Sequence, residues 1–477
     1  MRHAYSVETV RAAEAELMAR LPEGALMQRA AAGLAAAAAG LLGRVYGARV
    51  VLLVGSGDNG GDTLYAGARL VRRGARVDAV LLAPGRAHRA GLAALEKAGG
   101  RVADDPYEAL AVADLVLDGI TGIGGHGGLR PDAVPVARAA RGSGAAVVAV
   151  DLPSGIEADT GQVVGEALRA DATVTFGTYK PGLLIDPGRG YAGAVRLVDI
   201  GLEPHLPSVP DVEALQHADV AQLLPVPAAE SDKYRRGVVG IVAGSARYPG
   251  AAVLAVAGAL RGGAGAVRYV GPGADAVIAR FPETLVHGWP PSKAGRVQAW
   301  VVGPGLGDGP GVDEVLESDV PVLVDADGLR GLDPAAVRAR TAPTLLTPHA
   351  GEAAALLGVA REEVEGARLA SVRALVAKYG ATVLLKGSTT LVAGPDPRCA
   401  VRVNPTGTPW LATAGSGDVL SGLTGSLLAA GLEPFDAASV AAYLHGLAGR
   451  LVSRDAPVSA HDVATAIPRA WRDTTTP

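Results

Sequence analysis

The sequence predicts an α/β protein with two domains, each built on a buried parallel β-sheet. Three observations support this prediction. Short runs rich in β-branched residues alternate with Ala-rich stretches of helical character in both halves of the chain. The length of 477 residues suits two to four domains of ordinary size, roughly 100–200 residues each. A proline-rich stretch between residues 201 and 227 interrupts the alternation.

Strands in the first half are predicted where apolar, β-branched runs lie between turn residues. Their nearly continuous apolar character indicates strands covered on both faces, which is typical of a parallel sheet. Helices are expected between them, because parallel neighbours need crossover connections. The candidate strands are Arg49–Val54, Arg76–Leu82, Leu115–Asp118, Ala145–Val150 and Ala172–Phe176.

The second half repeats this pattern after the proline-rich stretch Gly201–Pro227, which is the predicted linker. We place the boundary near residue 215, so that the domains span residues 1–215 and 216–477. A hairpin-like pair of strands is expected near the end of the sheet. The candidate strands are Val238–Val242, Ala266–Val270, Ala299–Val302, Val320–Val324 and Thr382–Leu385, and the pair is Leu391–Ala393 with Val401–Val403.

Composition excludes several classes of protein. Hydrophobic residues make up 49% of the chain and charged residues 19%, so intrinsic disorder is excluded. A net charge of -4 argues against a general nucleic-acid binder, which would be basic. The single cysteine, Cys399, excludes an internal disulfide and a cysteine-based zinc site.

The same composition predicts a cytoplasmic protein without a membrane span. The longest strongly apolar stretch, Ala30–Gly43, covers about 14 residues of mostly Ala and Gly, whereas a span needs about 20. The N-terminus lacks the apolar core and cleavage pattern of a signal peptide. We expect small-molecule substrates and a homo-oligomer, with no membrane and no nucleic-acid partner.

A glycine-rich segment follows the first strand. Gly55, Gly57 and Gly60 form a G-x-G-x-x-G pattern, and Asp78 lies about 20 residues further on, as in a dinucleotide fingerprint. Two carboxylates, Asp58 and Asp62, accompany this loop and oppose a bound pyrophosphate unless a cation intervenes. The pattern alone is therefore weak, and a glycine-rich turn between strand and helix explains it equally well.

Polar residues also end two later strands of the first half. Asp118 precedes a second glycine-rich segment, and Asp151 begins the sequence DLPSG. Since the carboxyl ends of neighbouring parallel strands share one edge, both carboxylates and Asn59 are expected to converge there. Their oxygens suit a hard cation or acid–base catalysis. The alternative is that both aspartates only cap turns.

These motifs, NGGD, D-x-x-x-G-I-G and DLPSG, resemble the NAD(P)H-hydrate epimerase family over about residues 1–215, and FGTYKPGLL at Phe176–Leu184 fits as well. The resemblance implies a Rossmann-like, three-layer domain that interconverts the R and S epimers of hydrated NADH and NADPH. It implies that Asn59, Asp118 and Ser154 hold K⁺, that Asp151 faces the nicotinamide ring as a catalytic residue, and that Lys180 lies near the site. The implied substrate-binding residues are Asn59, Gly60, Gly61, Asp62, Thr63, Gly122, Ile123, Gly124, Gly125, His126, Gly127, Gly128 and Asp151, with the segment Gly122–Gly128 at the phosphates.

One position departs from that family. The residue after NGGD is usually Gly or Ala, and here it is Thr63. A β-branched side chain at this point is expected to narrow the pocket. A non-catalytic nucleotide-binding or oligomerisation module is therefore retained as the alternative for the first half.

The strongest motif of the second half is the segment Gly415–Asp418, GSGD, which opens an apolar helix. Backbone N–H groups at a helix start bind anions, and an adjacent carboxylate can take a proton from a substrate hydroxyl. Together they provide what phosphoryl transfer to an alcohol requires. The plainer interpretation is that Asp418 is only a helix cap.

Other strand ends of this half carry polar groups. The segment Lys386–Thr390 supplies a cation and hydroxyls for nucleotide phosphates, and Gly303–Gly307 is a glycine-rich loop. Asp325 and Asp327 either bind a cation or cap a turn. In the TPHAGE junction, His349 is interpreted as facing a ligand.

The motifs KGS, GPGLG, TPHAGE and GSGD resemble the NAD(P)H-hydrate dehydratase family, of ribokinase-like α/β fold, over about residues 225–470. The resemblance implies that Asp418 is the catalytic base, acting on the S epimer with ADP or ATP as co-substrate and Mg²⁺ in the site. Arg330 stands where the family usually has Asn. The implied nucleotide-binding residues are Lys386, Gly387, Ser388, Thr389, Thr390 and Gly417, and those contacting the hydrated dinucleotide are Ala251, Gly305, His349 and Asp418.

The two resemblances together predict a bifunctional repair enzyme that recovers both epimers. Two further alternatives remain open at this point. One is a ribokinase-like kinase of a small molecule, such as a vitamin precursor, fused to an accessory domain. The other, a NAD-dependent dehydrogenase, rests on the G-x-G-x-x-G pattern alone.

Overall fold

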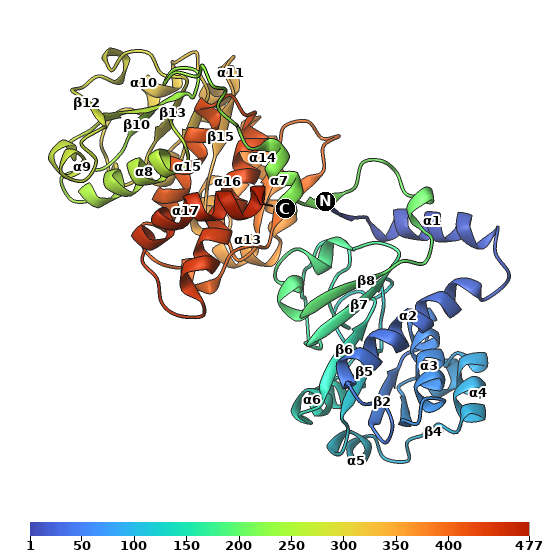
Figure 1. Ribbon diagram of the computed structural model, residues 1–477. Helices are drawn as coiled ribbons and strands as arrows, with labels where there is room; N and C mark the ends of the chain where they lie inside the picture. The colour runs from blue at the N-terminus through green and yellow to red at the C-terminus, as the bar shows by residue number, and fades with distance from the viewer. Residues whose placement is uncertain (477) are drawn as a thin grey trace. The chain divides into compact units, whose positions relative to one another are not determined.

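The computed structural model describes residues 1–476, which divide into two compact units (Figure 1). The first unit is His3–Asp211, and the second comprises Val212–Pro477 with Met1–Arg2. The division falls four residues before the position of about 215 expected from the sequence. The stretch from Gly201 to Pro227 contains the strand β9 (Val212–Ala214) and the helix α7 (His217–Leu223). Its second half is therefore ordered structure of the second unit.

The first unit is built on a seven-stranded parallel sheet in the order β4-β3-β2-β5-β6-β7-β8. The five predicted strands are present within one residue of their expected ends, and β4 and β8 were not predicted. The strands are β2 (Arg49–Val54), β3 (Arg76–Leu81), β4 (Arg101–Val102), β5 (Leu115–Gly119), β6 (Ala146–Val150), β7 (Ala172–Phe176) and β8 (Ala194–Val198).

Helices cover both faces of this sheet. Alternate residues of a strand therefore pack into two different hydrophobic cores, one on each face. Leu52 packs with α1, α2 and α3 on one face, whereas Leu53 packs with α5 and α6 on the other. This is the predicted three-layer arrangement. The helices are α1 (Val7–Met18), α2 (Ala25–Leu42), α3 (Asp58–Val71), α4 (Arg89–Ala98), α5 (Pro106–Ala111) and α6 (Val134–Gly142).

The helix α2 has 18 residues, more than the 14-residue apolar stretch noted in the sequence. By length and composition it is the one helix within residues 1–476 that could cross a membrane, a test that core helices also pass. It packs against α3, β7 and β8, and its alanines contribute to the core. A methyl group on Gly33 would lie 2.3 Å from Val198 Cγ1, so this glycine permits the close approach of α2 to β8.

The second unit contains the strands of an eleven-stranded sheet in the order β1-β9-β18-β17-β16-β15-β14-β13-β10-β11-β12. The neighbours from β12 to β16 are parallel, and β17 is antiparallel to both β16 and β18, as the hairpin-like pair predicted. The strands are β1 (Arg2–Ala4), of which only Arg2 is assigned to this unit, β9, β10 (Val238–Val242), β11 (Ala266–Val270), β12 (Leu285–His287), β13 (Ala299–Val302), β14 (Val322–Val324), β15 (Thr344–Leu346), β16 (Thr382–Leu385), β17 (Thr390–Ala393) and β18 (Val401–Asn404).

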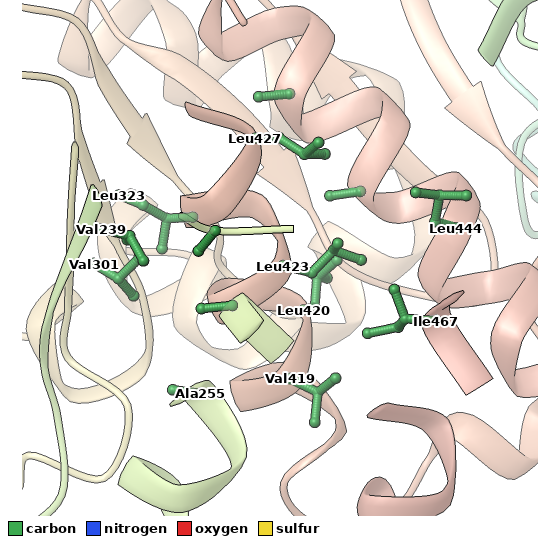
Figure 2. Close-up of a cluster of buried hydrophobic side chains, with 14 of the residues drawn as sticks. Val239, Ala255, Val301, Leu323, Val419, Leu420, Leu423, Leu427, Leu444 and Ile467 are labelled. Atoms are coloured by element: carbon green, nitrogen blue, oxygen red, sulfur yellow. The ribbon is translucent and has the colours of Figure 1, made fainter. Parts of the chain in front are cut away.

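The core of the second unit surrounds the helix α15 (Figure 2). Leu420, Leu423 and Leu427 of α15 lie among residues of β10, β13, β14, α16 and α17. The helices of this unit are α7, α8 (Pro249–Arg261), α9 (Ala274–Arg280), α10 (Val312–Leu316), α11 (Pro334–Ala339), α12 (Ala350–Leu357), α13 (Arg361–Gly366), α14 (Arg368–Tyr379), α15 (Ser416–Ala429), α16 (Pro434–Ser453) and α17 (Ala460–Thr475).

Glycines set the distance between α8 and α15. A methyl group on Gly422 would lie 1.8 Å from the carbonyl oxygen of Ala255, which is backbone and cannot turn aside. We therefore expect Gly422→Ala to lower the free energy of unfolding by about 1–3 kcal/mol, because the helices must move apart. Urea unfolding followed by circular dichroism measures this change.

The matched control for this substitution is Gly250→Ala in α8, where a methyl group meets nothing within 4 Å. It should leave stability unchanged within about 0.5 kcal/mol. Equal effects of the two substitutions would contradict the close-packing explanation.

Two candidate active sites

In the first unit, the candidate site lies where the strand order reverses. The chain builds β2, β3 and β4 outward and then returns to place β5 beside β2. The loops after β2 and β5 meet there: Asn59 Nδ2 donates a hydrogen bond to the Thr121 carbonyl oxygen at 3.1 Å. Ligands of open α/β sheets bind at such a reversal, outside the carboxyl ends of the strands.

Thr63 lies beneath this junction, and no part of its side chain is exposed. Its hydroxyl donates to the Asn59 carbonyl oxygen at 2.7 Å, and a methyl group on Gly119 would lie 2.0 Å from it. The sequence led us to expect that Thr63 narrows the pocket. Instead, its side chain packs between α3 and the end of β5. Its role is to hold the backbone that carries Asn59.

Asp118, at the end of β5, is completely buried. It accepts hydrogen bonds from the Ser154 hydroxyl at 2.6 Å, the Ser154 N–H at 2.9 Å and the Ile120 N–H at 3.3 Å. Burial raises the pKa of this carboxyl to about 6, although the Ser154 bonds lower it. No Lys or Arg within residues 1–476 forms an ion pair with Asp118.

The oxygen-rich surroundings of Asp118 include the other predicted K⁺ ligands. The Ser154 hydroxyl also contacts the Thr121 carbonyl oxygen at 3.3 Å, and Asn59 contacts the same carbonyl. The structure thus brings Asn59, Asp118 and Ser154 together around Thr121. Asp118 is thus a buried carboxyl without a cationic partner among the described residues, bonded by two N–H groups and one hydroxyl. Together with the nearby oxygens of Ser154 and Thr121, it offers ligands of the kind that a hard cation takes.

Asp151 follows β6 in a left-handed backbone conformation, with φ of 66°. Such a conformation is uncommon for a residue other than glycine and clusters at functional sites. Lys180 Nζ, which is 1% exposed, forms an ion pair with Asp151 Oδ1 at 2.5 Å. The Thr175 hydroxyl donates to the same oxygen at 2.9 Å. The structure therefore joins Lys180 directly to the predicted catalytic residue.

The segment Gly122–Gly128 follows β5 and is held by Glu157. One Glu157 oxygen accepts the Gly127 N–H at 2.8 Å, and the other lies 2.8 Å from His126 Nδ1. A phosphate bound to this segment would have to compete with the Glu157 carboxylate. This contact was not predicted from the sequence, because Gly127 and Glu157 lie 30 residues apart.

In the second unit, the candidate site forms around the start of α15. Gly415 precedes the helix in a left-handed conformation, with φ of 87°. Asp418 lies in the first turn, where burial, together with Asp325, raises the pKa of its carboxyl to about 7. A general base works best when its pKa lies near the ambient pH. Asp418 therefore has the properties of a proton acceptor at neutral pH.

Ser416, also in the first turn, is buried beside His445 of α16. The Ser416 hydroxyl lies 3.3 Å from His445 Nε2. Burial lowers the pKa of His445 to about 4, so the imidazole is neutral at physiological pH. It adds no positive charge to the site, and its role is to fix the serine.

Lys386, after β16, reaches toward the same helix start. Its Nζ forms an ion pair with Asp325 Oδ1 at 2.6 Å, and a methyl group on Gly417 would lie 3.5 Å from that Nζ. The Ser421 hydroxyl donates to Asp325 Oδ2 at 2.5 Å. Burial lowers the pKa of Lys386, but Asp325 and Glu352 raise it by more. Asp325 thus forms an ion pair with Lys386. From the sequence, Asp325 was expected to bind a metal cation or to cap a turn, and this pairing was not predicted.

The turn Lys386–Thr390 is held in place by Arg368, a residue that was not predicted from the sequence. Arg368, in α14, is buried and donates to the carbonyl oxygens of Leu385, Lys386 and Thr389 at 3.0–3.2 Å. This clamp fixes the turn that was predicted to bind nucleotide phosphates. A buried arginine is rarely visible in a sequence, because arginine is common on surfaces.

The loops after β10 and β13 meet at the strand-order reversal of the second unit. The Gly244 N–H donates to the Pro304 carbonyl oxygen at 2.8 Å. A methyl group on Gly305 would lie 2.5 Å from Ala251 Cβ, so these two predicted dinucleotide contacts are neighbours.

Asp327 accepts the Gly307 N–H at 2.8 Å and pairs with Arg330 at 2.7 Å. It therefore orients the glycine-rich loop. The unusual Arg330 takes part in an exposed ion pair with this same residue.

His349 is the N-cap of α12. Its Nδ1 accepts the N–H groups of Gly351 at 3.0 Å and Glu352 at 3.2 Å, while its Nε2 lies 3.3 Å from Glu352 Oε1. The side chain remains 58% exposed. It is therefore both a cap and accessible to a ligand, and Glu352 connects it to Lys386 at 3.8 Å.

No cluster of three or more His, Cys, Asp or Glu side chains suited to a metal ion occurs within residues 1–476. Asp325 is engaged by Lys386 and Ser421, and Asp327 by Gly307 and Arg330. Mg²⁺ commonly binds through one or two carboxylates together with substrate phosphates and water. The second site therefore fits Mg²⁺ carried by a nucleotide better than a resident metal.

Comparison with known proteins assigns the two units. Residues 239–469 match the NAD(P)H-hydrate dehydratase family, and residues 23–182 match the family described as YjeF-related protein N-terminus. A bifunctional NAD(P)H-hydrate repair enzyme of Mycobacterium leprae is 50% identical over 95% of both chains. This chain belongs to the bifunctional NAD(P)H-hydrate repair enzyme family. The family predicted from the sequence is confirmed.

Solved structures agree with the fold of the second unit. An ADP/ATP-dependent NAD(P)H-hydrate dehydratase from Bacillus subtilis, co-crystallised with ATP and Mg²⁺, is 31% identical, with a TM-score of 0.50 over 54% of this chain and 97% of its own. A ribokinase-like superfamily protein from Enterococcus faecalis, 23% identical with a TM-score of 0.50, covers 56% of this chain and 98% of its own. The predicted fold class is confirmed. Membership of the repair-enzyme family displaces the vitamin-precursor kinase and the dehydrogenase as interpretations.

The ion pair beneath the first candidate site allows a stability test. Lys180→Met removes the cation from the buried Asp151, whose side chain is 12% exposed. We expect the free energy of unfolding of the first unit to fall by about 3–5 kcal/mol, because an unpaired buried charge is strongly unfavourable. Chemical unfolding measures the change.

The control for Lys180→Met is Arg138→Met, which breaks the exposed pair of Arg138 with Glu166. An exposed pair contributes at most about 1 kcal/mol. If both substitutions change stability by less than this amount, the buried pair is not a structural requirement.

Proposed function

We propose that this protein repairs hydrated NADH and NADPH in two reactions. The first unit interconverts the R and S epimers, and the second dehydrates the S epimer with ADP or ATP as phosphoryl donor. The observation that carries the proposal is Asp418, a buried carboxyl with a pKa of about 7 at the start of α15, next to the Lys386 ammonium. This arrangement combines a proton acceptor with an anion-binding helix end.

The dehydration begins with the hydroxyl on the reduced nicotinamide ring. Asp418 takes the hydroxyl proton while the oxygen attacks the terminal phosphorus of the nucleotide. The new O–P bond forms as the bond to the leaving nucleotide breaks. The ring C–O bond then breaks with phosphate as the leaving group, and loss of a ring proton restores the dihydronicotinamide. Phosphate replaces hydroxide, which leaves poorly.

The residues around Asp418 have separate roles in this proposal. Lys386 and the turn Gly387–Thr390 bind the nucleotide phosphates, with Gly417 at the anion-binding helix start. Asp325 and Arg368 position Lys386 and its turn. Bound Mg²⁺ would supply charge neutralisation on those phosphates. The hydrated dinucleotide lies against Ala251, Gly305 and His349.

In the first unit, the proposal gives Asn59, Asp118 and Ser154 the role of holding K⁺, which neutralises the buried Asp118. The stretch Asn59–Asp62 at the start of α3 and the segment Gly122–Gly128 bind the substrate, the latter at its phosphates, while the buried Thr63 supports Asn59. Asp151 acts on the hydrated ring, with Lys180 fixing its orientation. We propose domains close to residues 1–215 and 216–477, a cytoplasmic location and a homo-oligomeric assembly.

The first experiment is to follow absorbance at 340 nm with an R/S mixture of NADPH hydrate, ADP or ATP, Mg²⁺ and K⁺. The proposal expects nucleotide-dependent recovery of the whole mixture, faster than spontaneous epimerisation allows. Rapid recovery of the S fraction alone would restrict the activity to the second unit and favour a non-catalytic first unit. No recovery with either nucleotide would overturn the proposal.

The assignment of the base is tested by Asp418→Asn. The substitution keeps the size of the side chain but removes the proton acceptor, so dehydration of the S epimer should fall by at least about 100-fold. Epimerisation, measured without nucleotide by separating the two epimers, should be unchanged. Dehydration at a rate near wild type would show that another group is the base.

The pH dependence gives an independent test of the same residue. Since the pKa of Asp418 is raised to about 7, the base is ionised above this pH and protonated below it. The kcat/KM of dehydration should therefore fall about tenfold per pH unit below this pKa. A profile that is flat through neutral pH, at saturating nucleotide, would contradict Asp418 as a base with this pKa.

A further inference from the structure

The hydrogen bonds of His349, at the start of α12, assign the position of its proton. Its Nδ1 accepts the N–H groups of Gly351 at 3.0 Å and Glu352 at 3.2 Å, so the lone pair of this nitrogen is occupied. In a neutral imidazole, one nitrogen accepts hydrogen bonds and the other carries the proton. His349 therefore carries its proton on Nε2.

This arrangement limits what His349 can do in the second candidate site. A general base needs a free lone pair, and imidazole is a common choice near neutral pH. Here Nδ1 caps the helix and Nε2 holds a proton, so no nitrogen is free to take a proton from a substrate. The side chain is nevertheless 58% exposed. It can offer a ligand the Nε2–H group as a hydrogen-bond donor.

Glu352 favours a neutral acceptor for this donor. Its Oε2 accepts the main-chain N–H of His349 at 2.8 Å, and its Oε1 lies 3.3 Å from His349 Nε2. Lys386 lies 3.8 Å from Glu352 but forms its closer ion pair with Asp325, at 2.6 Å. A phosphate oxygen brought to Nε2 would meet the carboxylate charge at close range, whereas a neutral carbonyl oxygen would not be repelled.

His349 lies beside the residues proposed for the chemical step. The carbonyl oxygen of the preceding Pro348 accepts the N–H of Lys386 at 2.9 Å. The Nζ of this lysine is 3.5 Å from the position of a methyl group on Gly417, the residue before Asp418. The reacting ring of the dinucleotide must reach Asp418, and the carboxamide is the neutral carbonyl group that this ring carries.

We propose that His349 donates a hydrogen bond from Nε2 to the carboxamide oxygen of the hydrated nicotinamide ring, and that it positions this ring without exchanging a proton. The inference rests on the proposed dehydratase function of the second unit. It deepens that function by giving a donor role to a residue otherwise expected only to contact the dinucleotide.

The first test uses the full-length protein with His349→Asn. Asparagine is a good N-cap, so it keeps an acceptor for the helix N–H groups, but it lacks the Nε2 donor. We expect KM for the S epimer to rise about tenfold, with kcat unchanged within about threefold, because one neutral hydrogen bond is lost. An unchanged KM would overturn the inference. A fall in kcat of at least about 100-fold would also overturn it, since that is the loss expected for a base.

Two further variants separate the donor from the cap and from the ring. His88→Asn changes the same kind of cap in the first unit, where His88 Nδ1 accepts the Gly91 N–H at 3.0 Å, and should leave dehydration unchanged. His349→Phe keeps a ring but has no donor, so KM should rise at least as much as in His349→Asn. A KM near wild type in His349→Phe would overturn the inference in favour of ring stacking. Thermal unfolding reports whether each variant is folded.

The acceptor on the substrate is tested with two products. The product NADPH and its thionicotinamide analogue differ only in that sulfur, a weak acceptor, replaces the carboxamide oxygen. As inhibitors of dehydration, NADPH should bind the wild-type protein at least about fivefold more tightly than the analogue. His349→Asn should lose this preference. An equal preference in both proteins would show that the two groups are not coupled and would overturn the carboxamide assignment.

The position of the proton has its own readout. Long-range ¹H–¹⁵N NMR spectra of the full-length protein with bound NADPH report which nitrogen of His349 is protonated. The proton should be on Nε2 at neutral pH, and a proton on Nδ1 would overturn the inference alone. A wild-type protein that neither dehydrates the S epimer nor binds NADPH would instead refute the proposed function.

Discussion

Both units depend on a buried lysine that pairs with an aspartate at the end of a parallel strand. Lys180 meets Asp151 at 2.5 Å, and Lys386 meets Asp325 at 2.6 Å. The carboxyl ends of parallel strands are where ligands bind, and acidic side chains there are buried by the loops that surround the site. In both places the ammonium is a compact point charge that contacts one carboxylate oxygen. These are two of only six lysines in a chain with 44 basic residues.

Three further aspartates of the two units are also buried, but the groups around their carboxyls differ. Asp118 accepts hydrogen bonds from the Ser154 hydroxyl and the Ser154 N–H and forms no ion pair within residues 1–476, which suits a bound cation. Asp62 has one buried oxygen without a hydrogen-bond partner, and burial, followed by Asp151, raises the pKa of its carboxyl. Burial, followed by Asp325, raises the pKa of Asp418 to about 7, while Lys386 lowers it. Burial raises the pKa of all three carboxyls, and the hydrogen bonds and charges beside each one differ.

Much of the fold was predictable because buried parallel strands have a distinctive apolar pattern. Strands such as Ala172–Phe176 and Thr382–Leu385 were predicted with their observed ends. Short strands such as β4 and β15, of two and three residues, were missed because so few residues carry no periodic signal. The predicted linker hid β9 and α7, since prolines at its ends resembled an unstructured connection.

The sequence by itself determined the two α/β domains, the family and the motifs at the strand ends, because these depend on local pattern and residue type. Tertiary structure alone decided what each motif residue does. Asp325 holds Lys386 across 61 positions of sequence, and Thr63 points into a helix–strand junction instead of a pocket. Burial and the nearest opposite charge set these roles, and both arise only when distant segments pack together.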